Sequence, residues 1–579
     1  MGEAYDLVIR GGTIYDGTGS NGFVGDVAIK NGVISAVGNV TENGIKEIDA
    51  TGLIVTPGFV DIHTHYDGQA TWDTRLTPSS EHGVTTVVMG NCGVGFAPCR
   101  EDDRQRLMSL MEGVEDIPNP VLAEGLSWNW ESFADYLDAL EATPHDIDFA
   151  TQVPHGALRV YVMGERGAAR DPASDADIEE MARLAEDAIR VGALGFSTSR
   201  TLNHRTSEGD PTPSYMAAER ELVGIARGLQ AAGSGILQVV SDFTDGQREL
   251  ELLHNMVAES GRPMITSLAQ SRQAPDSWKS LLAWVASENQ AGHDIKAMVA
   301  GRPVGILLGL EATMNPFSLN PEYRTIEHLP VAERVQAMRD PDVRSRILSA
   351  ENERADNAFN AVIANYDFMF VLGDPPDYEQ PKERSLAARA EREGTTPQAL
   401  AYDALLQNQG RALLYTPFLN YAGYDLEPSL EMMRHPNSVL GLGDGGAHVG
   451  MICDGSFPTS MLTHWTRDRT RGDLLDLAWV IKAQTRDTAL AYGLSDRGVI
   501  AEGFKADLNI IDYDRLRLGH PSIAFDLPAG GKRLVQPVEG YVATFVSGVA
   551  IQENGEPTGE LPGRLVRGEQ EQPIAMAAE

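Results

Sequence analysis

Near its beginning the chain reads Thr56-Pro57-Gly58-Phe59-Val60-Asp61-Ile62-His63-Thr64-His65. The apolar residues before the two histidines predict a buried strand that starts after a Pro-Gly turn. Because residues i and i+2 of a strand point to the same face, His63 and His65 project their imidazoles together. Two neutral imidazoles on a rigid strand make a good half-site for zinc or a similar divalent metal. The stretch therefore predicts a metal site at the end of a strand.

The middle of the chain predicts parallel strands with helical crossovers. Short β-rich runs alternate with helical patterns such as Asp175–Arg190, whose apolar residues keep a three-four spacing. The candidate strands are Phe59–His65, Val84–Asn91, Ile147–Pro154, Ala193–Ser199, Gly235–Asp242, Pro263–Ala269, Leu413–Leu419 and Val439–Asp444. This order predicts the α/β class and a (β/α)8 TIM-like barrel whose C-terminal strand ends carry the site.

One long stretch, at about 276–410, exceeds the length of a single crossover. It contains helical patterns at Ala332–Met338 and Ser385–Arg392. We expect it to be an insertion over the barrel mouth.

The two ends of the chain share a pattern of short strands and turns. Val27–Lys30 and Val33–Val37 flank Asn31-Gly32, a strong signal for a two-residue hairpin. Ala506–Ile511 and Tyr541–Val546 have the same β pattern. Because neither end has enough apolar residues for a large domain, we expect residues 1–57 and 491–579 to form one small β-sandwich subdomain. The barrel would then occupy residues 58–490.

Composition limits the class of protein. The 579 residues are 42% apolar and 22% charged, which excludes a disordered chain, and carry a formal net charge of -36. Such acidity excludes nucleic acid or anionic lipid as the main partner, because both require clustered Lys and Arg. Three cysteines exclude a disulfide framework. The sequence has no long apolar run for a membrane span, and its first residues do not resemble a secretory signal, so a cytoplasmic protein is expected.

Several motifs resemble the amidohydrolase superfamily, and more closely its N-acyl-D-amino-acid deacylase (D-aminoacylase) branch. Besides the His-x-His strand they are Tyr5–Gly12, Gly90-Asn91-Cys92-Gly93, His155–Arg159, Gly192–Thr198, Asp496–Ile500, Gly503–Leu508 and Pro562-Gly563-Arg564. The resemblance implies a hydrolase that cleaves the amide C–N bond of a small N-acylated or peptide-like molecule. It also implies a cofactor of one or two divalent ions, zinc or another metal.

The resemblance assigns two further site residues. Cys92, in a Gly-rich turn after an apolar run, corresponds to a metal-binding thiolate, and a thiolate suits zinc. Asp444 ends the last predicted strand and corresponds to the catalytic carboxylate, which can also bind metal. His448 lies four residues further on and is a candidate to bind substrate or metal.

Two expected histidines are missing. The family usually places one at the end of strand five and one at the end of strand six, where this chain has Val240 and Leu268. Three explanations stay open. A single ion could be held by His63, His65 and Asp444 near Cys92. Polar residues at shifted positions could substitute, the candidates being Asp242, Asp245, Gln238 and His204. Alternatively, metal chemistry is lost and the protein only binds.

Substrate contacts also depart from the family pattern. Leu202 and Gln270 stand where the family has a tyrosine and a lysine suited to a substrate carboxylate. Arg159, Arg200 or Arg205 could supply the positive charge, because arginine grips carboxylates bidentately. His155, in a Pro-His-Gly turn, is a candidate to steady an oxyanion.

Two alternatives to this function stay open. A cyclic-amide hydrolase of the dihydropyrimidinase type would need a lysine on the fourth strand, and Gly195–Ser199 contains none. A metal-poor binding or scaffolding relative is the alternative from another class. The sequence leaves stereochemistry, metal count and a homo-oligomer open.

Overall fold

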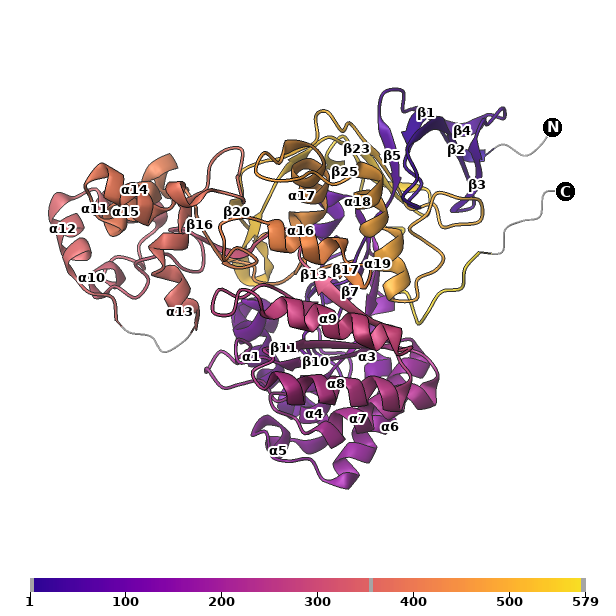
Figure 1. Cartoon of the computed structure of the whole chain (residues 1–579), viewed down its shortest axis with the longest axis horizontal. Coiled ribbons are helices and arrows are strands. Elements are labelled where there is room, and N and C mark those ends of the chain that lie inside the picture. The colour runs from indigo at the N-terminus through magenta and orange to yellow at the C-terminus, as the bar shows by residue number, and fades with distance from the viewer. Residues whose placement is uncertain (1–4, 354–357, 574–579) are drawn as a thin grey trace.

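The computed structural model describes residues 5–353 and 358–573. In that part of the chain, parallel strands form two neighbouring sheets (Figure 1). The first has the order β6 (Phe59–Asp61), β7 (Val84–Met89) and β8 (Asp148–Thr151). The second has the order β9 (Val153–Pro154), β10 (Gly195–Arg200), β11 (Ile236–Ser241), β12 (Met264–Leu268), β13 (Ile295–Val299) and β17 (Ser438–Leu440).

The two sheets meet at both edges. Only Gln152 separates β8 from β9, and a parallel bridge pairs Thr64, after β6, with Gly445, after β17. One buried cluster also draws residues from strands of both sheets, among them Val60, Val88, Ala150, Ile236, Ile265, Met298 and Val439. Parallel strands in chain order that fill a common centre are the arrangement of a TIM barrel.

Helices follow the strands as the sequence predicts. Helix α6 (Asp175–Val191) coincides with the predicted helix at Asp175–Arg190 and begins with a capping box from Ser174. It packs against α7 (Glu219–Ala232), which in turn packs against α8 (Gly246–Ser260). With α9 (Ser277–Gln290), these helices cover the strands in the lower part of Figure 1.

The prediction that Leu413–Leu419 is the seventh parallel strand is wrong. Leu413–Leu419 does form a strand, β16 (Leu414–Leu419), but it pairs antiparallel with β14 (Val304–Leu308) and β15 (Phe370–Val371). The place between β12 and β17 belongs to β13, a short strand inside the stretch 276–410 that is predicted to be an insertion. Periodicity cannot separate two short buried strands, because both read as brief apolar runs.

The stretch 276–410 therefore contains α9 and β13, and β13 lies among the parallel strands, between β12 and β17. The predicted helices inside it are confirmed as α11 (Val331–Met338) and α14 (Leu386–Glu393). Together with α10 (Pro321–Arg324), α12 (Pro341–Ser349) and α15 (Pro397–Leu405), they form the group at the left of Figure 1. Thr313 contacts the loops near the candidate site through Asp116 and Gly450. Coverage of the mouth stays a prediction.

Both ends of the chain contribute to one sheet. Its nine described strands include β1 (Tyr5–Ile14), β2 (Phe23–Lys30), β3 (Val33–Gly38), β4 (Gly44–Asp49) and β5 (Ile54–Pro57). The C-terminal strands are β18 (Leu508–Ile511), β23 (Tyr541–Val546), β24 (Val549–Glu553) and β25 (Glu556–Pro557). Asn31 and Gly32 join β2 to β3 with φ of 52° and 77°, as the hairpin signal requires. The sandwich form and the bounds 1–57, 58–490 and 491–579 stay predictions.

Among the described residues, none of the helices combines the length and apolar character that a membrane crossing needs.

Candidate metal centre

His63 and His65 lie just beyond the end of β6, and both are 1% exposed. The backbone holds them in place, because the amide of His63 donates to Asp61 Oδ1 (3.1 Å) and that of His65 to the carbonyl of Gly445 (2.8 Å). Their rings meet edge to face with centroids 5.3 Å apart. The strand is shorter than predicted, yet the two imidazoles still face one space.

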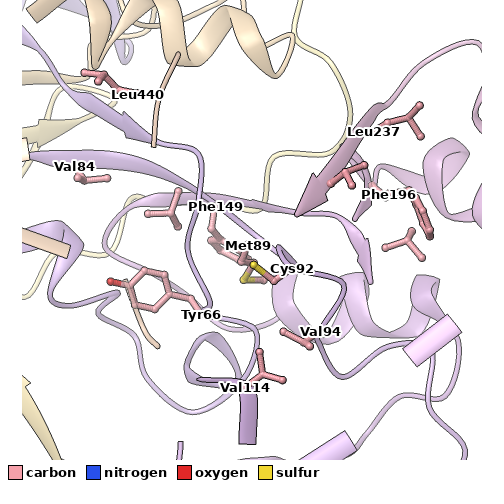
Figure 2. Close-up of a cluster of buried hydrophobic side chains, with 14 of the residues drawn as sticks. Tyr66, Val84, Met89, Cys92, Val94, Val114, Phe149, Phe196, Leu237 and Leu440 are labelled. Atoms are coloured by element: carbon pink, nitrogen blue, oxygen red, sulfur yellow. The ribbon is translucent and has the colours of Figure 1, made fainter. Parts of the chain in front are cut away.

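Cys92 approaches the histidines from the turn after β7. Its φ of 56° places it in the left-handed region, and Figure 2 shows it among buried side chains such as Met89. The sulfur lies 3.4 Å from His63 Nε2, and the amide donates to Gln238 Oε1 (3.2 Å). Burial raises the pKa of the Cys92 thiol to about 11. A thiolate at this position therefore requires a neighbouring cation.

Asp444 reaches the same space from the turn after β17. Its Oδ1 lies 3.3 Å from His63 Nε2 and 3.6 Å from His65 Nε2. Burial alone would raise the pKa of Asp444, but the hydrogen bond with His65 and the charges of His63 and His448 outweigh burial and hold the pKa well below its usual range. Asp444 is therefore ionised in this site.

The positions on either side of Asp444 have no room for a side chain larger than that of glycine. A Cβ on Gly443 would lie 2.4 Å from Asp61 Oδ2, and one on Gly445 would lie 2.5 Å from Ser79 Oγ. The Gly-rich turn thus lets Asp444 come close to the strand that carries the histidines.

These donors fit a divalent metal. Ligand atoms of His63, His65 and Cys92 all lie within 4.8 Å of one another, and Asp444 adds a carboxylate oxygen. Imidazole nitrogen, thiolate sulfur and carboxylate oxygen are the ligands that zinc takes in proteins. The residues present therefore suit the metal that the sequence predicts.

Glu115 is a site residue that the sequence analysis missed. It ends α1 (Arg104–Glu115), in the connection between β7 and β8, and is 1% exposed. Its Oε1 lies 3.3 Å from His65 Nδ1, and its Oε2 lies 3.5 Å from His448 Nε2. The one local signal was an acidic residue in the last turn of a helix, where the helix dipole disfavours negative charge.

His448 and His204 lie at the edge of this centre. The amide of His448 donates to the carbonyl of Glu115, and its side chain is 16% exposed. His204 Nδ1 lies 2.9 Å from Ser199 Oγ. Burial, followed by the positive potential of His448 and His65, lowers the pKa of His204 to about 3, so its ring is neutral. Both predicted histidines therefore lie near the candidate metal ligands.

Two predicted substrate residues are placed elsewhere. His155 is fully buried, with Nδ1 2.8 Å from Thr198 Oγ1 and Nε2 3.0 Å from Glu221 Oε1. Neither ring nitrogen is left for an oxyanion, so this prediction is corrected. Arg200 is likewise 8% exposed and bonded to Glu249 and to the carbonyl of Ala217. The ion pair and hydrogen bonds occupy its guanidinium, so the prediction that Arg200 binds substrate is corrected too.

The other candidate cations are also engaged. Arg159 donates to Glu221 Oε1 (2.8 Å) inside the core, and Arg205 donates to the carbonyl of Gly209 (2.8 Å). Gln270 bonds to the backbone of Pro275 and Ala422. Contacts within the protein therefore already engage the polar groups of Arg159, Arg205 and Gln270.

Val240 and Leu268, which replace the two missing histidines, lie among apolar side chains in the structure. Leu268 is 1% exposed and Val240 packs against the core. Of the shifted candidates, Asp242 accepts hydrogen bonds from Thr201 and Leu202, and Asp245 precedes α8. Gln238 touches the centre only through the amide of Cys92. The first explanation, a site built on His63, His65, Asp444 and Cys92, agrees best with these placements.

Comparisons with known proteins give the family. Residues 46–551 match the Amidohydrolase family. The N-acyl-D-glutamate deacylase of Alcaligenes xylosoxydans xylosoxydans is 26% identical over 576 residues, covering 98% of this chain and 97% of that protein. The D-aminoacylase of the same organism is 36% identical over 232 residues, covering 40% of this chain and 43% of that protein.

A solved structure has the same fold. It is the N-acyl-D-glutamate deacylase of Bordetella bronchiseptica complexed with zinc and a phosphonate inhibitor, with a TM-score of 0.63 at 22% identity. The match covers 98% of this chain and 100% of that chain. The chain therefore belongs to the amidohydrolase family.

Proposed function

We propose that the protein is a metal-dependent hydrolase that cleaves the amide C–N bond of an N-acylated amino compound or small peptide-like molecule. The observation that carries this proposal is the convergence of His63, His65, Cys92 and Asp444 at the C-terminal ends of parallel strands. Relatives named D-aminoacylase and N-acyl-D-glutamate deacylase support the same bond class. The fold we infer is a closed (β/α)8 barrel.

We infer one ion, held by His63, His65 and Asp444 with Cys92 beside it. Apolar Val240 and Leu268 argue against a second set of histidine ligands. When bound, zinc or a similar ion supplies Lewis acidity that polarises the amide carbonyl and makes water more acidic.

Asp444 carries the proton in this mechanism. Its carboxylate is ionised and 14% exposed, so it can accept a proton from the attacking water. Donating that proton to the nitrogen of the leaving amine completes the cleavage. Glu115 faces Nδ1 of His65, on the side of the ring away from Asp444, and can orient that ring. We expect His448 and His204, which lie at the edge of the centre, to contact the substrate.

The substrate need not carry a carboxylate beside the amide. Of the three candidates to bind one, Arg159 and Arg200 are paired with Glu221 and Glu249. The third, Arg205, donates to the carbonyl of Gly209. We therefore expect N-acylated amines and aryl amides to compete well with N-acyl-amino acids. A cytoplasmic location and a homo-oligomer stay predictions.

A hydrolysis screen with metal analysis tests the proposal. The purified protein, loaded with zinc, is assayed on N-acyl-D- and N-acyl-L-amino acids, dipeptides, aryl amides and a hydantoin. We expect bound metal and turnover of an open-chain amide, and His63→Asn should abolish the turnover and lower the amount of bound metal. His328→Asn, at an exposed histidine of the insertion, is the matched control. Bound metal with turnover of the hydantoin alone would favour a cyclic-amide hydrolase, and no bound metal with no turnover would favour a binding protein.

A further inference from the structure

A second group of metal-type ligands lies outside the candidate centre. His254 is on α8, Glu288 is on α9, and His293 is in the turn that leads into β13. His293 comes two residues before β13 begins, whereas His63 follows the end of β6. Since the strands are parallel, the two groups lie toward opposite ends of them. The second group is therefore separate from the site described above.

The three side chains converge on one point. Nδ1 of His254 lies 3.0 Å and Nδ1 of His293 lies 2.6 Å from the same oxygen, Glu288 Oε2. The two rings meet at 5.3 Å between centroids. All three ligand atoms lie within 4.8 Å of one another. Two imidazole nitrogens and a carboxylate oxygen form the donor set of many open zinc sites.

The turn that carries His293 is rigid. The amide of His293 donates to the carbonyl of Glu288 (3.0 Å), and Gly292 adopts a φ of 99°. Asn289 Nδ2 donates to the carbonyls of Val285 (2.8 Å) and Ile295 (2.6 Å). Because these bonds fix Glu288 and His293 relative to each other, two of the three donors are already in place before any ion arrives.

Charge and exposure also suit a cation. Burial of Glu288 opposes its ionisation, but hydrogen bonds from His254 and His293 outweigh it and lower the pKa of Glu288. The side chains of His254, Glu288 and His293 are 43%, 12% and 24% exposed, so an ion can enter and keep water on its free side. The chain's net charge of -36 adds a favourable field.

We propose that His254, Glu288 and His293 bind a divalent transition-metal ion, such as zinc, that fastens α8, α9 and the start of β13 together. The bound ion stabilises the folded chain by mass action, because its three ligands come from separate segments that unfolding pulls apart. The proposal does not depend on the hydrolase function.

The test is zinc binding to the full-length protein after chelator treatment. Stoichiometry is measured by isothermal titration and elemental analysis, and the melting temperature is followed with and without zinc. A His63→Asn background weakens the candidate centre, so the ion that remains reports on the second group. In that background we expect about one zinc per chain and a zinc-dependent rise in melting temperature.

Both signals should disappear when His254→Asn and His293→Asn are added, and should persist when His328→Asn is added instead. Glu288→Gln is a second variant that keeps both imidazoles and should weaken zinc binding at least about tenfold, as loss of a charged ligand implies. Circular dichroism without zinc checks that each variant folds. The same zinc stoichiometry and the same melting shift in the double variant as in its background would overturn the proposal.

Discussion

Replacing Glu115 by glutamine tests whether this carboxylate positions His65 for metal binding. The substitution keeps the size and one carbonyl oxygen of the side chain, but it removes the charge that faces two histidines. Glu115 Oε1 lies 3.3 Å from His65 Nδ1 and Oε2 lies 3.5 Å from His448 Nε2. A carboxylate behind a metal-binding histidine fixes the orientation of the ring and makes it a stronger ligand.

The expected loss can be estimated from these contacts. Residues behind metal ligands typically contribute about 10- to 100-fold to metal affinity, or about 1.4 to 2.8 kcal/mol. The contact with His65 is at ion-pair distance and is not a hydrogen bond, because neither Glu115 Oε1 nor His65 Nδ1 has a hydrogen-bond partner among the described residues. We therefore expect a loss near the lower limit, about tenfold. Zinc affinity is measured by competition with a chromophoric chelator, and activity is measured at saturating zinc.

Glu112→Gln is the matched control, because Glu112 is on the same helix and its Oε1 accepts only the amide of Asn119. That variant should bind zinc as the wild type does. If Glu115→Gln also keeps wild-type zinc affinity while its melting temperature is unchanged, Glu115 does not position His65 and the reasoning is refuted.

Three further changes have expected outcomes. Asp444→Asn should lower kcat by about 10²- to 10⁴-fold, the range for a lost general acid–base group, and wild-type turnover in a zinc-loaded sample would refute its role. Cys92→Ser should retain the fold but weaken zinc binding. The loss should exceed the about 10- to 100-fold loss that is typical when a residue supporting a ligand is replaced. Unchanged affinity in the chelator competition would mean that the sulfur is not a ligand. Asp148→Asn should reduce the free energy of unfolding at pH 7, but by less than the about 3–5 kcal/mol expected for an unpaired buried charge. Arg497 and Lys505 lie 2.7 and 3.1 Å from Asp148 Oδ2, and each would keep one counter-charge, Asp496 for Arg497 and Asp507 for Lys505. Burial of Asp148 would raise its pKa, but Lys505 and Arg497 lower it below the usual value, so the ionic contribution is present above about pH 4 and is lost as the pH falls through the folded-state pKa. Urea unfolding should thus show a smaller difference between wild type and Asp148→Asn in acid than at pH 7, and an equal difference would contradict the assignment.

Local sequence was sufficient where short-range chemistry decides the structure. Asn31-Gly32 predicted its hairpin because few dipeptides adopt positive φ at both positions. Asp175–Arg190 predicted α6 because its apolar residues repeat with the helical period. The spacing of His63 and His65 likewise brought two imidazoles to one side of the chain, although β6 ends before them.

Local sequence failed where two distant segments compete for one place. Leu413–Leu419 and Ile295–Val299 both read as short buried strands, and only the pairing of β13 with β12 and β17 decides which one lies among the parallel strands. His155 was expected at the barrel mouth because it follows a strand. Its second ring nitrogen, however, is hydrogen-bonded to Glu221 on another helix.

The sequence by itself determined which donor atoms the candidate site can offer. The His-x-His spacing, a cysteine in a Gly-rich turn and an aspartate after the last strand specify donor atoms, and donor atoms select the metal. Only the tertiary structure decided which side chains share the site. It brought Glu115 behind His65, enclosed His155 and Arg200 in the core, and separated a second histidine group at the other end of the strands. The physical reason is that coordination depends on distances of a few ångströms between residues far apart in the chain, and packing alone sets those distances.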